Sequence, residues 1–269
     1  MLSIKELQSA IDKYQSLDFQ TISIEEAYEL FCQIMIGFYV APLVLYNEPI
    51  FRARKHSEKG KLFENMSDLI YPINPSKYGR LNDVGESIFY GALNKDTAFV
   101  EMRLKVNDEV TLLESKRKSS SQLLMMEIGI KEIIIEKGSK PDFNRVHLDR
   151  FEQTCDSMEK KDRYHIINDF LITEITKIVS DSETYKYKST IAIGQHYIKG
   201  NPATEGMLYP SITRQKAGCI ALKPHSYDKF YAPDKCFKLK VTDIGGNGEI
   251  TLLCENISHK IENNGKIIW

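Results

Sequence analysis

Two arginine-bearing segments of the sequence have the residue types and spacing of an anion-binding site. In an extended strand, Arg52 and Arg54 point to the same face because side chains alternate with a period of two. Arg80 follows Gly79 in a polar, loop-like stretch, where the backbone can approach a ligand closely. A guanidinium group can hold a phosphate through two parallel hydrogen bonds. We therefore interpret these arginines as a candidate phosphate clamp.

Three further side chains extend this candidate set: Tyr90, Glu101 and Ser211. Each also has an ordinary structural interpretation. A tyrosine in an apolar segment commonly packs in the core, a glutamate on a short helix commonly faces solvent, and a serine after a proline commonly forms a turn or a helix cap. Strand arginines are also commonly surface charges. Residue types and spacing alone leave the function open, so the order of the motifs has to decide it.

The elements around these residues predict an α+β fold. Ser3 with Glu6, and Ser23 with Glu26, have the spacing of capping boxes, and each pair opens an amphipathic helix before residue 48. Strands are expected at 50–54, 87–92, 110–114, 123–130, 190–193, 207–209, 219–222, 237–241, 250–254 and 267–269. Because these strands do not alternate regularly with helices, the pattern favours mixed or antiparallel sheets over a βαβ fold.

Three further predictions concern the elements that connect the motifs. The stretch from about 131 to 188 is expected to be a mainly helical insertion, and its clearest helix spans 164–179. The apolar face of that helix holds Ile167, Leu171, Ile175 and Ile178. Asp96 is expected to cap the helix that carries Glu101. The glycine-rich stretch 245–248 predicts a hairpin turn.

Composition narrows the class of protein. The 269 residues contain 36 Lys and Arg against 37 Asp and Glu, and this balance argues against sequence-independent nucleic-acid binding. The apolar stretch 34–46 is interrupted by Pro42 and is shorter than the roughly 20 residues that span a bilayer. The five cysteines form no C-x-x-C pair and the histidines match no metal motif. We expect a cytoplasmic globular protein with reduced thiols, no metal and no membrane contact.

The motifs occur in an order that is similar to one known family. The block FRAR at 51–54 is followed by GRLNDVGESIFYGALNKDTAFVE at 79–101, and then by EGMLYPS at 205–211 and GCIALKP at 218–224. Together these blocks resemble the RES family, which is named for its Arg, Glu and Ser residues. The resemblance covers about residues 50–103 and 205–224. Many members carry an aromatic residue directly after the first arginine, where this chain has Ala53.

The resemblance implies a fold similar to ADP-ribosyltransferases and an enzyme that degrades NAD by hydrolysis or phosphorolysis. Such enzymes are chiefly bacterial toxins that are paired with an antitoxin. We expect a helical extension at 1–48, outside the match, and a catalytic domain at 49–269 that contains the helical insertion at about 131–188. It also implies that NAD is a substrate, that inorganic phosphate can serve as co-substrate, and that no resident cofactor is needed. The residues matched to the family's functional positions are Arg52, Arg80, Tyr90, Glu101 and Ser211.

The resemblance also gives each matched residue an expected role. Arg52 and Arg80, with Arg54 as an additional candidate, would bind the pyrophosphate of NAD. Tyr90 would contact the nicotinamide or a ribose. Glu101 would bind a ribose hydroxyl and stabilise an oxocarbenium-like transition state. Ser211 would hydrogen-bond the substrate or position the attacking group, so Glu101, Arg80 and Ser211 are the expected catalytic residues.

Other functions stay open at this point. An ADP-ribosyltransferase that modifies a macromolecule would use the same residues, although Phe99 stands where such transferases carry a second acidic residue. A non-catalytic module that binds NAD or a protein partner is the third interpretation, because a fold does not determine a function. A protein antitoxin or regulatory partner and a homodimer are the expected protein contacts.

Overall fold

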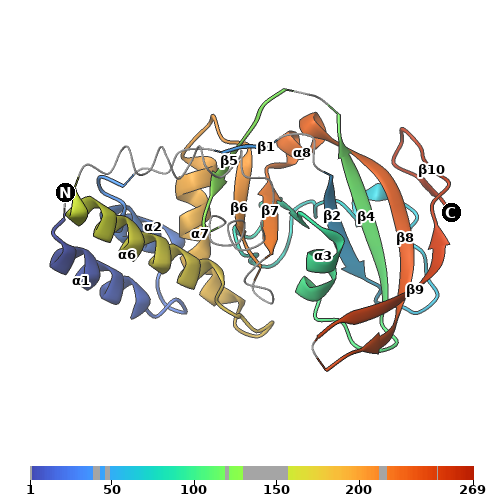
Figure 1. Ribbon diagram of the computed structural model, residues 1–269, viewed down its shortest axis with the longest axis horizontal. Coiled ribbons are helices and arrows are strands. Elements are labelled where there is room, and N and C mark those ends of the chain that lie inside the picture. Colours follow the sequence, from blue (N-terminus) through green and yellow to red (C-terminus); the bar gives the residue numbers. More distant parts are fainter. Residues whose placement is uncertain are drawn as a thin grey trace.

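The computed structural model describes residues 2–38, 43–45, 49–118, 121–129, 157–211, 217–246 and 248–269. Its helices α1, α2, α6 and α7 gather at one end of the molecule, and the strands β8 and β9 curve around the other end (Figure 1). The N-terminus lies at the helical end and the C-terminus lies at the opposite end.

A nine-stranded mixed sheet forms the centre of the described part of the chain, in the order β1-β5-β6-β7-β3-β2-β4-β8-β9. Neighbouring strands are antiparallel except β5 and β6, which are parallel. The strands are β1 (Leu43–Leu45), β2 (Ile50–Lys55), β3 (Phe89–Ala92), β4 (Glu109–Arg117), β5 (Leu123–Glu127), β6 (Gly206–Pro210), β7 (Gly218–Leu222), β8 (Tyr231–Ile244) and β9 (Ile250–Ile257). A small separate sheet pairs β10 (Lys260–Ile261) with β11 (Ile267–Ile268).

This arrangement confirms the predicted α+β class with mixed sheets. The hairpin predicted at the glycine-rich turn is also confirmed, because β8 and β9 pair antiparallel across it. The closer likeness to ADP-ribosyltransferases and the division into an extension and a catalytic domain stay predictions.

The two predicted N-terminal helices are confirmed as α1 (Ile4–Gln15) and α2 (Ile24–Ile34). Both begin with complete capping boxes, in which the serine accepts from a backbone N–H and the glutamate accepts from the serine's backbone. These helices pack against α6 (Met158–Ile175) and α7 (Lys188–Gly194). Their shared core includes Leu7, Tyr14, Phe31, Phe170 and Ile193.

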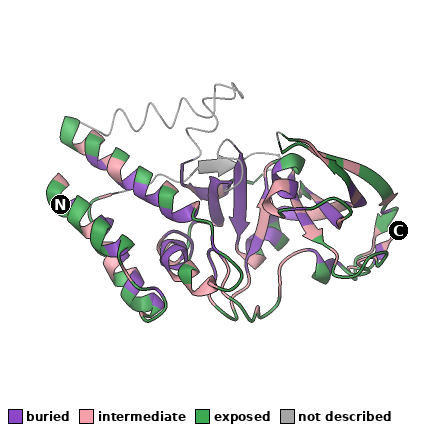
Figure 2. Cartoon of the chain, turned by 90° about the horizontal axis from the view of Figure 1, so that it is seen from below, coloured by how far each residue is buried: buried purple, intermediate pink, exposed green. Residues whose placement is uncertain are grey.

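The central strands β6 and β7 are buried on both faces, as Figure 2 shows for the middle of the sheet. Met207, Cys219 and Ala221 pack with the helical core that contains Phe170. Leu208 and Ile220 belong to the opposite core, where the ring of Tyr227 on α8 (Pro224–Phe230) stacks on Phe89 at 4.3 Å. Burial on both faces makes these strands a rigid support, because each large apolar side chain contributes about 1.5–3 kcal/mol.

Three predictions about secondary structure were wrong. The expected strand 190–193 lies within α7, because a β-branched run buried on every side looks the same in a strand and in a core helix. The helix expected at 164–179 is α6, which starts at Met158 and ends at Ile175, and Ile178 is 72% exposed. Asn94, instead of Asp96, caps the helix that carries Glu101.

The rest of the predicted helical insertion has a mixed outcome. Residues 130–156 lie outside the described residues, so the prediction for them stays untested. The described remainder contains α6 and a 3₁₀ turn, Thr184–Tyr187, and α7 begins at its last predicted residue. Within the described ranges, no helix combines the length and the apolar character needed to cross a bilayer.

Candidate active site

A small pocket lies where β2 and β3 diverge. The two strands share a single register pair, Phe51 with Ala92, whereas β2 pairs with β4 along all six of its residues. The pocket has a volume of about 110 Å³. It is lined by Phe51, Arg52, Ala53, Tyr90, Gly91, Ala92, Ala98, Glu101, Met102, Tyr209 and Cys219.

Glu101 enters this pocket from the last turn of α3 (Lys95–Glu101). The side chain of Asn94 caps the helix by accepting from the backbone N–H of Thr97 at 2.8 Å. Ala98 and Phe99 on the same helix pack in one core with Phe51 and Ala53 of β2. The short helix is therefore fixed on the sheet, and the side-chain carboxylate of Glu101, its last residue, is held at the pocket.

Ser211 lies directly beside this carboxylate, at the end of β6. Its side chain is fully buried, and its hydroxyl donates a hydrogen bond to Oε1 of Glu101. Its backbone N–H donates to the carbonyl of Ala217 at 2.7 Å, which continues the β6–β7 ladder. The structure thus joins two of the sequence-predicted residues in a single carboxylate–hydroxyl pair.

Cys219 and Tyr209 also line the pocket and were not among the candidate site residues chosen from the sequence. Cys219 on β7 pairs with Tyr209 on β6 and with Ala92 on β3. Burial and the charge of the nearby Glu101 carboxylate raise the pKa of the Cys219 thiol well above its usual range. Both residues lie within blocks that carry the family resemblance, Tyr209 in EGMLYPS and Cys219 in GCIALKP, so their place in these blocks is the signal that could have indicated them.

Among the described arginines, Arg52 lines the pocket. Its Nε donates to the carbonyl of Leu69 at 2.8 Å, its Nη1 donates to the carbonyl of Tyr90, and its guanidinium lies 5.7 Å from the ring centre of Phe89. Burial, followed by repulsion from Arg54, lowers the pKa of Arg52 to about 10, so the group stays cationic at neutral pH. These two backbone contacts engage two of the five guanidinium N–H donors.

Arg54 points to the same face of β2, as the alternation of side chains predicted. Its Nη1 donates to the carbonyl of Asp68, next to the Leu69 carbonyl that Arg52 holds. Asp68 ends a 3₁₀ turn, Met66–Asp68. Arg54 holds this turn and is not among the residues that line the pocket, whereas Arg52 is.

Tyr90 connects the pocket wall to the loop that carries Arg80. Its hydroxyl accepts from the backbone N–H of Leu81 and donates to Oδ1 of Asn82, both at 2.8 Å. Burial raises the pKa of this phenol, which therefore stays protonated. A Cβ on Gly79 would lie 2.1 Å from Oδ1 of Asn82, so a larger residue there would displace the amide that accepts from Tyr90.

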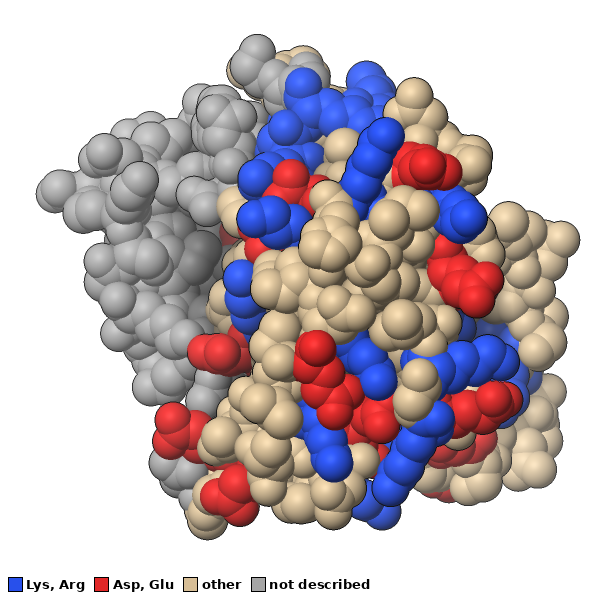
Figure 3. Space-filling view, turned by 90° about the vertical axis from the view of Figure 1, so that its right-hand side faces the viewer, with Lys and Arg blue, Asp and Glu red and all other residues tan. Residues whose placement is uncertain are grey.

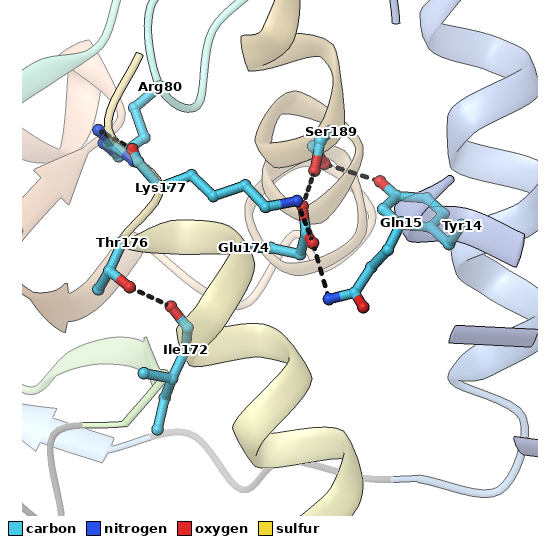
Figure 4. Close-up of polar contacts among 8 residues, drawn as sticks. All are labelled: Tyr14, Gln15, Arg80, Ile172, Glu174, Thr176, Lys177 and Ser189. Atoms are coloured by element: carbon cyan, nitrogen blue, oxygen red, sulfur yellow. Dashed lines mark hydrogen bonds and ion pairs between the residues drawn. The ribbon is translucent and has the colours of Figure 1, made fainter. Parts of the chain in front are cut away.

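The guanidinium of Arg80 is held by the C-terminus of α6 (Figure 4). It donates to the carbonyl of Ile175 and, at 3.2 and 3.3 Å, to that of Lys177. It also lies 5.3 Å from the ring centre of Tyr187. A cation at the negative end of a helix dipole is favourable. Arg80 does not line the pocket, but its positive charge lowers the pKa values of Tyr90, Tyr209 and Cys219 against the effect of burial.

A buried carboxylate ties the same end of α6 to the N-terminal helices (Figure 4). Glu174 is fully buried and accepts from the hydroxyl of Ser189, from Nζ of Lys177 at 2.6 Å and from Nε2 of Gln15 at 3.2 Å. The hydroxyl of Tyr14 donates to the carbonyl of Ser189 at 2.8 Å. The helices α1, α6 and α7 thus meet in one polar network next to Arg80.

Charge on the outer surface does not form a single-sign patch on the side that carries β8, β9 and β10. Figure 3 shows lysine and arginine side chains interspersed there with aspartate and glutamate. Lys238, for example, contacts Glu109 at 3.0 Å and Glu255 at 3.1 Å. Within the described part of the chain, no three His, Cys, Asp or Glu residues gather closely enough to hold a metal ion.

The fold and the pocket define an α+β protein with a partly buried serine–glutamate pair where two strands diverge. A family model described as the RES domain matches residues 49–237, which is 189 of the 269 residues. The chain therefore belongs to the RES domain family, as its motifs indicated. The match spans all six candidate site residues. No curated protein and no solved structure matches the chain.

Proposed function

We propose that this protein degrades NAD by cleaving the bond between nicotinamide and ribose, as a glycohydrolase or a phosphorylase. Membership of the RES family supports a role in NAD chemistry of the toxin type. The observation that carries the proposal is the hydrogen-bonded pair of Ser211 and Glu101 beside a pocket lined by a cationic arginine. In this proposal the enzyme is a cytoplasmic bacterial toxin or defence effector that a protein partner restrains.

The chemistry follows from the charge that develops during the reaction. The carbon–nitrogen bond breaks, its electron pair leaves with neutral nicotinamide, and positive charge builds on the ribose ring, as in glycoside hydrolysis. The Glu101 carboxylate stabilises that charge and binds a ribose hydroxyl. Water or inorganic phosphate then attacks the anomeric carbon and releases a proton to the carboxylate or to solvent. Ser211 holds the carboxylate in the orientation that this step needs.

The pocket size limits which part of NAD it holds. Its volume of about 110 Å³ is well below the roughly 300–1,000 Å³ of sites that enclose a whole ligand of moderate size. We place the nicotinamide end here, against Phe51, Tyr90 and Tyr209, and the remainder of the dinucleotide outside. In this arrangement Arg52 provides the positive charge nearest to the pyrophosphate.

Arg80 has a different role in this proposal from the direct phosphate contact expected from its motif. Its guanidinium is engaged by the carbonyls of Ile175 and Lys177, and its loop holds Tyr90 through Leu81 and Asn82. We propose that Arg80 keeps its loop, and through it Tyr90, in position, and that it adds positive electrostatic potential behind Tyr90. Arg54 supports Arg52 by holding the adjacent turn.

The position of Phe99 disfavours transfer of ADP-ribose to a macromolecule. The second acidic residue of such transferases would stand two positions before Glu101, and Phe99 is buried there in the core shared with Leu112 and Val241. A carboxylate at that position would require desolvation of a charge. Hydrolysis or phosphorolysis is therefore the reaction that the site supports best.

Incubation of the purified protein with labelled NAD, with and without inorganic phosphate, tests the proposal. Free ADP-ribose indicates hydrolysis, and an ADP-ribose 1''-phosphate that forms only with phosphate indicates phosphorolysis. Label on a protein or nucleic acid would replace the proposal with transfer. A folded protein that binds NAD but releases no nicotinamide would overturn catalysis and leave a binding module.

A further inference from the structure

Glu174 is a fully buried carboxylate that the proposed reaction does not use. It lies in the last turn of α6, where Oε2 accepts from the hydroxyl of Ser189 on α7. Oε1 accepts from Nζ of Lys177 at 2.6 Å and from Nε2 of Gln15, on α1, at 3.2 Å. Burial of a charge is unfavourable unless the charge is paired and hydrogen-bonded. These three donors meet that condition, and they fix the carboxylate relative to both α1 and α7.

One side of this network holds the guanidinium of Arg80 (Figure 4). Lys177, whose ammonium pairs with Glu174, also offers its backbone carbonyl to Arg80, at 3.2 Å from Nη2 and 3.3 Å from Nη1. The carbonyl of Ile175, the residue directly after Glu174, accepts from Nη1 as well. The carboxylate therefore ties down the short segment of chain that receives the guanidinium.

The other side of the network holds the main chain of the same arginine. Thr190 follows Ser189 on α7, and its hydroxyl donates to the backbone carbonyl of Arg80. Glu174 thus reaches Arg80 by two routes, through Lys177 to the side chain and through α7 to the main chain.

We propose that Glu174 is a positioning residue, which holds Arg80 by its side chain and its main chain and thereby keeps Tyr90 in place at the pocket. The backbone N–H of Leu81 donates to the Tyr90 hydroxyl at 2.8 Å, and this hydroxyl donates to Oδ1 of Asn82 at 2.8 Å. Tyr90 lines the pocket, whereas Glu174 does not. The effect on turnover rests on the proposed function, but the network itself does not.

Helix α1 is part of the same support. The hydroxyl of the fully buried Tyr14 donates to the carbonyl of Ser189 at 2.8 Å, and the next residue, Gln15, contacts Glu174. This helix lies outside the range 49–237 that the family model matches. The N-terminal segment of this chain therefore contributes to the geometry of the pocket as well as to the helical core.

Hydrogen exchange at the Leu81 amide tests the proposal without any turnover, because this N–H is bonded to the Tyr90 hydroxyl. Glu174→Gln keeps the shape but removes the charge that holds Lys177, and it should speed exchange of this amide by about tenfold or more. Tyr14→Phe removes one hydroxyl and should speed exchange by a smaller factor, so it decides the outcome if Glu174→Gln does not fold. Exchange at the wild-type rate in the folded variants would overturn the proposal.

Ile167→Ala is the matched control for a general loss of stability. Ile167 lies on α6, two turns before Glu174, and its side chain is 1% exposed in the helical core. The variant should lower the urea midpoint of unfolding because it removes packed apolar atoms. Exchange of the Leu81 amide should nevertheless stay close to that of the wild type. Equal acceleration in Ile167→Ala and Glu174→Gln would leave Glu174 with a purely structural role.

The kinetics of nicotinamide release test the path through Tyr90. Glu174→Gln should raise the KM for NAD by about fivefold and change kcat by less than about twofold, because Tyr90 contacts the bound substrate and the transition state alike. In a Tyr90→Phe background, Glu174→Gln should have little further effect on KM, since residues that act through one another do not give additive effects. Additive effects on KM would overturn the path. If the wild type releases no nicotinamide, the proposed function fails, while exchange at Leu81 still decides on the positioning role.

Discussion

Ser211 and Glu101 stand 110 positions apart in the chain, yet the serine hydroxyl donates directly to the glutamate carboxylate. The pair forms because α3 is packed on β2 while Ser211 directly follows β6, near the centre of the same sheet. Ser211 is fully buried, so the packing around it fixes the position of its hydroxyl. This relationship makes the carboxylate a preorganised group, and the first prediction follows from it.

Glu101→Gln should reduce nicotinamide release by at least about a hundredfold, which is the effect of losing one preorganised electrostatic group. Glutamine keeps the shape and can still accept from Ser211, so folding and NAD binding should change little. Turnover assays and binding calorimetry on the same preparation measure the two effects. Glu29→Gln on the exposed side of α2 is the control. Near-normal turnover in Glu101→Gln would remove Glu101 from the catalytic role.

The two arginines of β2 should differ in their effect on substrate binding. Arg52 lines the pocket and Arg54 does not, although both hold backbone carbonyls of the same turn. Arg52→Lys should raise the KM for NAD by about tenfold or more, because the lysine ammonium lacks the planar set of N–H donors of a guanidinium. Arg54→Lys should raise it far less. Equal effects of the two variants on KM would overturn the assignment of Arg52, and not Arg54, to the pyrophosphate.

Arg80→Ala should lower the free energy of unfolding by about 3 kcal/mol, because the carbonyls at the end of α6 lose charge-assisted hydrogen bonds. Urea denaturation measures this change. Lysine can supply one of these contacts, so Arg80→Lys should recover part of the loss. If Arg80→Ala keeps wild-type stability but shows a raised KM for NAD, the guanidinium contacts the substrate instead of α6.

Acid should destabilise the protein partly through His56. Its ring lies 2.8 Å from the hydroxyl of Thr111, and burial lowers its pKa below the ordinary value of about 6.5. The unfolded chain therefore binds the proton at a higher pH than the folded chain does. The free energy of unfolding accordingly falls as the pH drops below about 6.5, the ordinary pKa of histidine. Urea unfolding at about pH 7.5 and about pH 5 measures the loss. His56→Gln should lose less stability than wild type over this interval, whereas the exposed His259→Gln should behave like wild type.

The sequence indicated most of the strands that build the pocket, because their β-branched and apolar runs are short and bounded by turn residues. It misplaced α7 because Ile191, Ala192 and Ile193 are all buried, and a helix buried on every side has no amphipathic period. It also extended α6 to Ile178, whose apolar side chain fits the helical spacing but lies in solvent. Local pattern cannot distinguish such cases, since tertiary packing decides them.

The charged members of the site could be proposed from motifs, but their partners could not. The contact of Arg80 with the end of α6 joins residues 95 positions apart, and no local rule predicts it. Cys219 carries no charge and lies in an apolar strand, so its residue type gave no signal that it lines the same pocket as Glu101. Such contacts depend on which strands become neighbours, which the sequence pattern leaves undetermined.

The place of β7 in the sheet has a consequence for the order of assembly during protein synthesis. β3 and β6 both line the pocket, and they are joined only when β7, which begins at residue 218 of 269, enters between them. Because chains are made from the N-terminus and distant pairings form late, the pocket cannot close until β7 has left the ribosome. A nascent or prematurely terminated chain that ends before Gly218 therefore carries Glu101 without Cys219 and the strand that joins β3 to β6, and the cell meets a complete site only in chains that extend past β7.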